Sequence, residues 1–263
     1  MSSLFLTFFS LEWSIAKSYP IRILFNLIHI AMIITLFFYI SKTLGNIPFL
    51  QGKYFPFVAS GLAFQYLFSG IINASPAKTL EWRDIGVLES LIHSPTSSWR
   101  IYLTAGSYDI IFSFVKALLI VSGILYFTKA SVDFLWMTSS LFLITGLALN
   151  LSIISTCSFL LWKKVSLIEM GGSLSSLFLA GVYFPVDILP KAFQWMAFIN
   201  PAYHSLLLFR KSLRIHSPDM ELMSAQSSFL ILSAWLFITF LFSILFYKYS
   251  EKKILSKGSL SHH

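Results

Sequence analysis

The sequence predicts an all-α polytopic membrane protein with six transmembrane helices. Hydrophobic residues make up 56% of the 263 residues and charged residues only 11%, whereas an average soluble domain carries roughly 25% charged residues. Apolar segments recur along the chain, each near the ~20 residues that a helix needs to cross the hydrocarbon core. The alternating ten-residue pattern of barrel strands is absent from the sequence, and lipid offers no partner for unpaired backbone groups, so helices are favoured.

The apolar segments set the limits of the predicted spans, which together form one transmembrane domain over residues 1–263. The spans cover residues 21–41, 54–75, 104–127, 134–161, 167–184 and 228–248. Six spans place both termini on one side of the membrane. The loops and ends of that side hold most Lys and Arg, although the long segment 185–227 on the other side adds four more. The positive-inside rule therefore predicts cytoplasmic termini in an inner (plasma) membrane.

Residues 1–20 show a polar stripe that suits a helix lying along the membrane surface. Ser and Thr recur at spacings of three and four residues, and Pro20 ends the pattern. The rest of this segment is mostly Leu, Phe and Ile. Such an amphipathic segment is typical of an interfacial helix. The alternative is the frayed beginning of the first span.

The loop at 77–100, AKTLEWRDIGVLESLIHSPTSSWR, is the most polar internal stretch. Its apolar residues fall at helical spacing, and Pro95 stops the pattern. A short amphipathic helix is therefore expected between two spans, either resting on lipid or filling a groove on a partner. The residues that would form it are Ile85, Val87, Leu88, Glu89, Leu91, Ile92 and His93.

The segment 181–210, GVYFPVDILPKAFQWMAFINPAYHSLLLFR, is interrupted by three prolines and carries three charges. It is too broken for a plain span and too apolar for a water-facing loop. Irregular backbone at membrane depth is tolerated only where protein or a wet cavity covers it. A re-entrant segment and an apolar external cap are both compatible with this pattern.

Motifs for chemistry are missing from the sequence. It contains no GxxxxGK[ST] phosphate loop, no HExxH and no GxSxG. Cys157 is the single cysteine, so neither an internal disulfide nor a Cys-based metal site is expected. The net charge of +8 is read as a topology signal in this apolar chain, not as a nucleic-acid site. We therefore expect no enzyme activity and no cofactor in this chain; active transport would need an ion gradient or another chain.

Lys116 lies midway along the predicted span 104–127, where a lysine costs about 2.5–3.5 kcal/mol on the insertion scale. The surrounding apolar residues outweigh that cost, and the charge should face the protein interior or a wet cavity. Asp109 lies two turns earlier on roughly the same face. Two interpretations remain open: the pair faces a substrate path or dimer interface, or Lys116 forms an internal ion pair with Asp109 or Glu169.

The order of these elements resembles the export permeases of type-2 ATP-binding cassette (ABC) transporters. The stretch 86–106, GVLESLIHSPTSSWRIYLTAG, is similar to the family's Gly-x-Leu-Glu-x-Leu-x-x-Ser-Pro loop. The second similar stretch is the segment 181–210. It resembles drug and nodulation-factor lipooligosaccharide exporters, and its Asn-Pro pair resembles polysaccharide and O-antigen permeases. Its marker residues are Phe184, Pro185, Asp187, Pro190, Pro201 and Arg210.

The resemblance implies an assembly and a mechanism. The loop helix would be a coupling helix that docks on an ABC ATPase subunit, which binds the ATP and Mg²⁺. A second permease chain, identical or not, would complete the pore among membrane lipids. Residues 182–210 would re-enter the outer leaflet before the last span. The cargo would be an amphipath: a lipid-linked saccharide, a lipooligosaccharide or a hydrophobic drug.

Two other classes remain as alternatives. An ion-driven secondary transporter or channel would need coupling carboxylates at the midplane and an inverted repeat, and only Asp109 and Glu169 approach the first requirement. An integral enzyme of lipid metabolism would need a clustered His/Asp or nucleophile set, which the sequence does not display.

Overall fold

The computed structural model describes residues 2–43, 54–92, 94, 96–129, 131–162, 171, 177–215 and 223–257. Within these ranges the chain forms helices and turns and no strand. The elements are α1 (Ser2–Ser18), α2 (Pro20–Thr43), α3 (Tyr54–Asp84), α4 (Leu88–Ile92), α5 (Ser98–Ala105), α6 (Ser107–Thr128), α7 (Phe134–Trp162), the 3₁₀ turn η1 (Val186–Ile188), α9 (Lys191–Ile199), α10 (Pro201–Ser212) and α12 (Ala225–Lys257).

Five segments of the described chain are long and apolar enough to cross a membrane: α2, α3, α5 with α6, α7 and α12. They correspond to five of the six predicted spans and are candidate spans by length and composition. Half of the other predicted span, 167–184, lies outside the described residues, which between Trp162 and residue 177 include residue 171 alone. Residues 179–184 form turns and bends, so the helix predicted to continue to residue 184 ends earlier.

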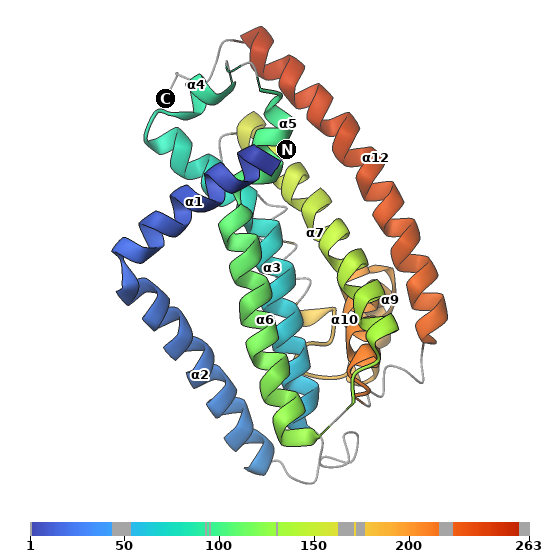
Figure 1. Ribbon diagram of the computed structural model, residues 1–263. Coiled ribbons are helices and arrows are strands. Elements are labelled where there is room, and N and C mark those ends of the chain that lie inside the picture. Colours follow the sequence, from blue (N-terminus) through green and yellow to red (C-terminus); the bar gives the residue numbers. More distant parts are fainter. Residues whose placement is uncertain are drawn as a thin grey trace.

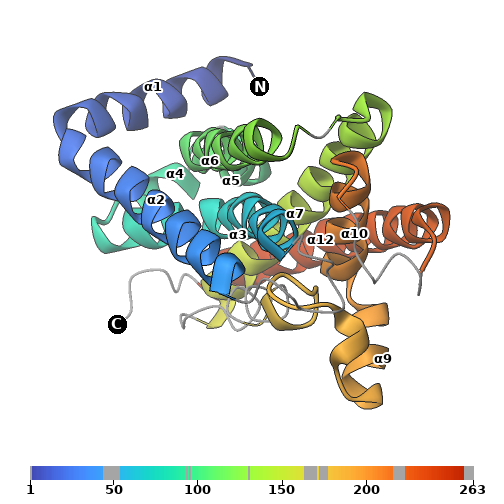
Figure 2. The same cartoon turned by 90° about the horizontal axis from the view of Figure 1, so that it is seen from below.

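Helices α3, α6, α7 and α10 form the centre of the bundle, with α2 on one side and α12 on the other (Figure 1). Seen from below, α2 and α12 flank the α3–α6 pair, and α9 projects outward (Figure 2). Small residues allow close approach here: a Cβ on Gly70 would collide with Ser113, and one on Gly106 with Ala74. Such close contacts are the usual basis of helix packing in membranes.

The bundle has two distinct ends. Helices α1, α4 and α5 and the last turns of α12 gather at one end, and α9 and α10 lie towards the opposite end (Figure 1). We refer to these as the α4 end and the α10 end. The start of α1 and the end of α12 thus lie at the same end of the molecule, in keeping with an even number of crossings.

Helix α3 is longer than the predicted span 54–75. At about 1.5 Å per residue, its 31 residues exceed the ~30 Å hydrocarbon core. Pro76 lies inside the helix without ending it. The polar residues after it, expected in a loop, therefore extend α3 beyond the membrane core at the α4 end.

The prediction that Ile85 and Val87 belong to the loop helix is wrong. Both residues belong to a turn, and α4 begins only at Leu88. Gly86 has φ +74°, a left-handed conformation that interrupts the helix. The following span also begins earlier than the predicted residue 104: α5 starts at Ser98 and meets α6 at Gly106.

Candidate functional site

The α4 end is a packed platform made by α3, α4, α5 and α7. Leu88 is only 2% exposed and packs in one cluster with Trp82, Ile101 and Tyr102. Leu91 is half-buried against the same cluster. The apolar side of α4 therefore faces its own chain, and the side chains of Leu88 and Leu91 pack inside the platform and not on its surface.

The surface of the platform consists of the turn before α4 and the outer side of that helix. Ile85 is 64% exposed and Val87 39%, and Glu89 is exposed beside them. The side chain of Ile92 and all of His93 lie outside the described residues. The structure thus separates the predicted contact set into an exposed part around Ile85, Val87 and Glu89 and a supporting part around Leu88.

An ion pair ties the N-terminal helix α1 to this platform. Lys78 on α3 is 7% exposed, and its Nζ donates to Glu12 of α1 at 2.8 Å and to Glu81 at 2.7 Å. Phe8 of α1 packs on Trp82 with ring centroids 5.3 Å apart. Sequence reasoning missed this anchor; the available signal was Glu12 placed among apolar residues of an otherwise amphipathic helix.

Other apolar side chains of α1 point away from the platform. Leu6, Leu11, Trp13 and Ile15 are all at least 40% exposed. Helix α1 is held to the bundle on one side by the Lys78–Glu12 ion pair and by aromatic contacts such as Phe8–Trp82. A helix that also exposes large apolar side chains suits the boundary between headgroups and acyl chains. The helical prediction for residues 1–20 is confirmed as α1, and its place at the membrane surface stays a prediction.

Lys116 lies on α6 in a polar seam between α2, α3 and α6. Its Nζ is 3.5 Å from the Oδ1 atom of Asn26 and lies over the rings of Phe112 (4.7 Å to the centroid) and Tyr66 (5.9 Å). Among the described residues, the ion pairs within 4 Å do not join Lys116 to Asp109. Glu169, the other partner considered, lies outside the described residues.

The α2 side of the seam carries three polar residues at helical spacing. Arg22, Asn26 and His29 follow one another at intervals of four and three residues and share a face. The hydroxyl of Tyr66 on α3 lies 3.4 Å from Nδ1 of His29. Sequence reasoning did not single out this strip, because each residue is isolated in an apolar run and its partners come from helices distant in sequence.

The broken segment is divided where its prolines predict. Pro185 precedes η1, Pro190 is the N-cap residue of α9, and Pro201 is the first residue of α10. The Oδ1 atom of Asn200 accepts the Ala202 amide at 3.0 Å and caps α10. Proline fits a first helical turn because the amide that it lacks would have no helical partner there.

Arg210 holds this segment against α3. The side chain is 1% exposed, and its guanidinium donates to the carbonyls of Gly181 (2.8 Å) and Phe57 (3.1 Å) and to Oγ of Ser60 (3.3 Å). It also lies 3.6 Å from the ring centroid of Phe57. Arg210 therefore connects α10, the turn at Gly181 and the first turns of α3 at the α10 end.

An open apolar pocket of about 500 Å³ lies on the outer side of the same segment. Phe184 and Pro190 line it, so two of the predicted re-entrant residues border a cavity. Asp187, between them in sequence, is half-buried on η1. The remaining lining residues are Phe178, Leu179, Leu189, Phe193 and Met196.

The described chain is thus an apolar helical bundle with a packed platform at one end and a broken segment held by Arg210 at the other. This architecture is compatible with the membrane component of a transporter. In the described ranges no group of His, Cys, Asp or Glu could hold a metal ion. The family model for the ABC-2 type transporter matches residues 3–213. The chain belongs to this family and is a permease component of an ABC transporter. A comparison with curated proteins gives no match.

Proposed function

We propose that this chain is a half-sized export permease that pairs with a second permease chain, identical or not, and is driven by two separate ATPase subunits. The observation that carries the proposal is the family match over residues 3–213 together with an exposed apolar turn on a packed platform. ATP and Mg²⁺ are bound by the partner ATPase. The cargo is an amphipath, either a lipid-linked saccharide, a lipooligosaccharide or a hydrophobic drug.

The ATPase contact in this proposal is the surface around Ile85, Val87 and Glu89. Two exposed apolar side chains beside a carboxylate offer the apolar centre and polar rim of a docking surface. Leu88 anchors the surface to α3 and α5, and α5 continues into α6 across Gly106. A push on the turn would therefore reach two central spans directly.

The proposed assembly also fixes how the chain lies in the membrane. The α4 end faces the cytoplasm, and six spans bring both termini there. The described residues on either side support the additional crossing. Phe159 near the end of α7 lies against Arg83 at the end of α3 (4.8 Å), whereas Arg210 donates both to the carbonyl of Gly181 and to that of Phe57 in the first turn of α3. The segment 182–210 enters the outer leaflet, and Asp109 and Lys116 face the substrate path.

The double substitution Ile85→Arg/Val87→Arg tests the docking surface. Interface hot spots cost about 2 kcal/mol or more when removed, so the affinity for the ATPase should fall more than about tenfold. Co-purification of the ATPase and ATP-driven export are measured together. Both side chains are exposed, so insertion of the permease should be unaffected.

Ile188→Arg is the matched control. Ile188 is also an exposed apolar residue (50%), but it lies in η1, in the broken segment at the α10 end and away from the proposed docking surface. ATPase retention should be normal in this variant. Equal retention of the ATPase by the double variant and the wild type would remove the turn from the interface.

A further inference from the structure

We propose that the seam between α2, α3 and α6 seats the phosphate-bearing headgroup of an anionic lipid that enters sideways from the bilayer, with its acyl chain lying along α2. The inference rests on the proposed function, in which Lys116 faces the substrate path. It adds the ligand class, the residues of the headgroup seat and the direction of entry.

The seam has an excess of positive charge around Lys116. Asp109 interacts electrostatically with Lys78, Arg22 and Lys116 and with the carboxylate of Glu12. Because Lys78 is paired with Glu12 and Glu81, Arg22 and Lys116 are left with Asp109 as their nearby carboxylate. The ammonium of Lys116 has three protons to donate, and it contacts Asn26 through one long hydrogen bond and the rings of Tyr66 and Phe112. A cation at membrane depth requires polar or anionic partners. A phosphate oxygen between Arg22 and Lys116 supplies them.

Helix α2, which borders the seam, is largely open to lipid. Only 6% of the most apolar 18-residue window of α2 is buried, whereas 67% of the corresponding window of α3 is buried. Asn26 and His29 nevertheless face α3 and α6, as their contacts with Lys116 and Tyr66 show. The seam is therefore lined by polar groups on its inner side and bordered by a helix that is open to lipid.

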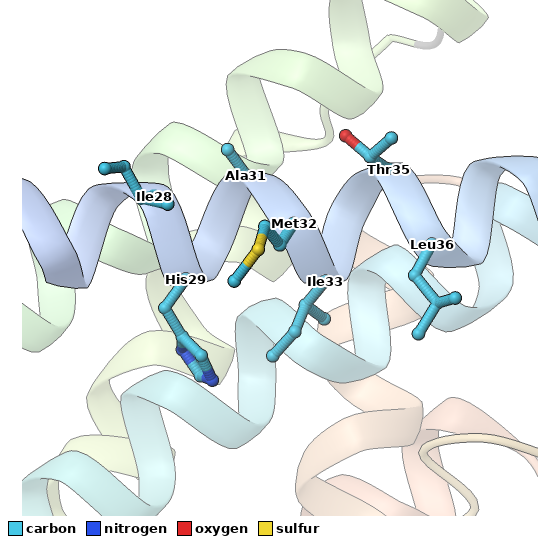
Figure 3. A pocket seen from close by; sticks show the side chains of 7 residues that line it. All are labelled: Ile28, His29, Ala31, Met32, Ile33, Thr35 and Leu36. Atoms are coloured by element: carbon cyan, nitrogen blue, oxygen red, sulfur yellow. The ribbon is translucent and has the colours of Figure 1, made fainter.

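An open apolar hollow lies against α2 and reaches His29, next to the polar seat. It has a volume of about 610 Å³, and its lining residues all belong to α2: Ile28, His29, Ala31, Met32, Ile33, Thr35 and Leu36. Figure 3 shows these side chains along the helix, with His29 pointing towards α3. Its volume falls within the roughly 300–1,000 Å³ of ligand sites.

The lengths agree with one acyl chain. From Asn26 to Leu36 the helix rises about 15 Å, at about 1.5 Å per residue. That distance is half of the ~30 Å hydrocarbon core, which is the depth of one leaflet. The seat at Asn26 lies roughly 9 Å along α2 from Pro20.

Native mass spectrometry of the purified permease tests the proposal, with phosphatidylglycerol and phosphatidylcholine of identical chains as probes. The wild type should retain phosphatidylglycerol preferentially. Lys116→Met should lower that affinity about tenfold, as expected for the loss of a charge-assisted hydrogen bond, and Lys116→Arg should preserve it. Lys191→Met, which removes an equal charge from the exposed start of α9, should behave as the wild type.

A variant in the hollow tests the position of the chain. Met32→Trp fills the space beside α2 and should weaken the binding of both lipids, because Met32 is 60% exposed and lines the hollow. Inorganic phosphate is the third probe. It should not displace phosphatidylglycerol at equal concentration, because it brings no acyl chain; complete displacement would identify a free-anion site and overturn the lipid proposal.

Two results contradict the inference outright: no preference for phosphatidylglycerol in the wild type, or an unchanged preference in Lys116→Met. If Lys116→Met folds poorly, the lipid preference of the wild type and the result for Met32→Trp still test the proposed lipid site. ATPase retention is measured on the same samples. A wild type that prefers phosphatidylglycerol but retains no ATPase would contradict the proposed function and leave the lipid seat standing.

Discussion

Helices α2 and α3 are adjacent in sequence and both are long enough to span a membrane, yet their environments are opposite. The most apolar window of α2 has a mean hydropathy of 2.3 and is 6% buried; that of α3 has a mean hydropathy of 1.5 and is 67% buried. The more hydrophobic helix is the less buried one. Lipid is as apolar as a protein interior, so hydrophobicity alone gives a span no reason to leave it.

Helix α3 is central because its small and polar residues form specific contacts. Gly61 and Gly70 allow close approach of Val182 and Ser113, and Ser75 donates to the Tyr102 carbonyl at 2.7 Å. Helix α12 resembles α2, with a mean hydropathy of 2.5 and 17% of its window buried. The central helices thus form a rigid frame, and α2 and α12 present surfaces to lipid and, in the proposed assembly, to the second permease chain.

The frame should be most sensitive to the loss of Arg210. In Arg210→Met, the carbonyls of Gly181 and Phe57 lose a buried donor, at about 1–3 kcal/mol for each group left unsatisfied. Thermal unfolding in detergent measures the loss. Lys211→Met is the matched control, because its exposed side chain should change stability by less than about 0.5 kcal/mol. Equal melting of the two variants would show that Arg210 does not hold the frame.

A methyl group at Gly61 should have a smaller effect. The new Cβ of Gly61→Ala would lie 2.5 Å from the carbonyl oxygen of Val182, and overpacking of this kind costs about 1–3 kcal/mol. Gly123→Ala on α6 meets nothing within 4 Å and should be neutral or stabilising, because alanine favours a helix by up to about 1 kcal/mol. A destabilised Gly123→Ala beside a normal Gly61→Ala would reverse the frame assignment.

Acidification should produce the smallest effect, through His204 on α10. Its Nε2 lies 2.8 Å from the Phe198 carbonyl and its Nδ1 3.3 Å from the Ser228 hydroxyl. This pairing suits a neutral ring, which donates from one nitrogen and accepts at the other. Burial lowers the pKa of His204 below its ordinary value, and the bond to Phe198 partly opposes the shift.

The sign follows from proton binding. Because the pKa of His204 is lower in the folded state, the unfolded chain binds more protons as the pH falls through about 6.5. The stability contribution is therefore present at pH 7 and lost on acidification, by at most about 1.4 kcal/mol per pH unit. Melting at pH 7.5 and 5.5 should show a larger loss for the wild type than for His204→Gln. Parallel losses would contradict this role.

Composition and apolar length were sufficient to predict most of the fold. The predicted span 134–161 corresponds to α7 (Phe134–Trp162) and 21–41 to α2, because runs of apolar residues of this length have one stable conformation in lipid. The prolines predicted the divisions of the segment 181–210. The length of α3 was missed, because a polar sequence such as that after Pro76 is compatible with both loop and helix.

The candidate sites were predicted less completely. The sequence identified the stretch around Leu88 and the charge of Lys116, but not which side chains are exposed. Leu88 is buried by residues of α5 that follow more than ten positions later, and Asn26 reaches Lys116 across 90 positions. Pairings of this kind depend on how helices cross, and a single sequence contains no record of crossing angles.

The central claim is that this permease is driven by a separate ATPase held at the platform around Val87. Isolating the tagged chain from its native membrane and reconstituting it in vesicles tests that claim most directly. The account predicts that an ABC ATPase is isolated with the wild type, is lost from Ile85→Arg/Val87→Arg, and is required for ATP-dependent export. Export of cargo by the purified chain without any ATPase would contradict it.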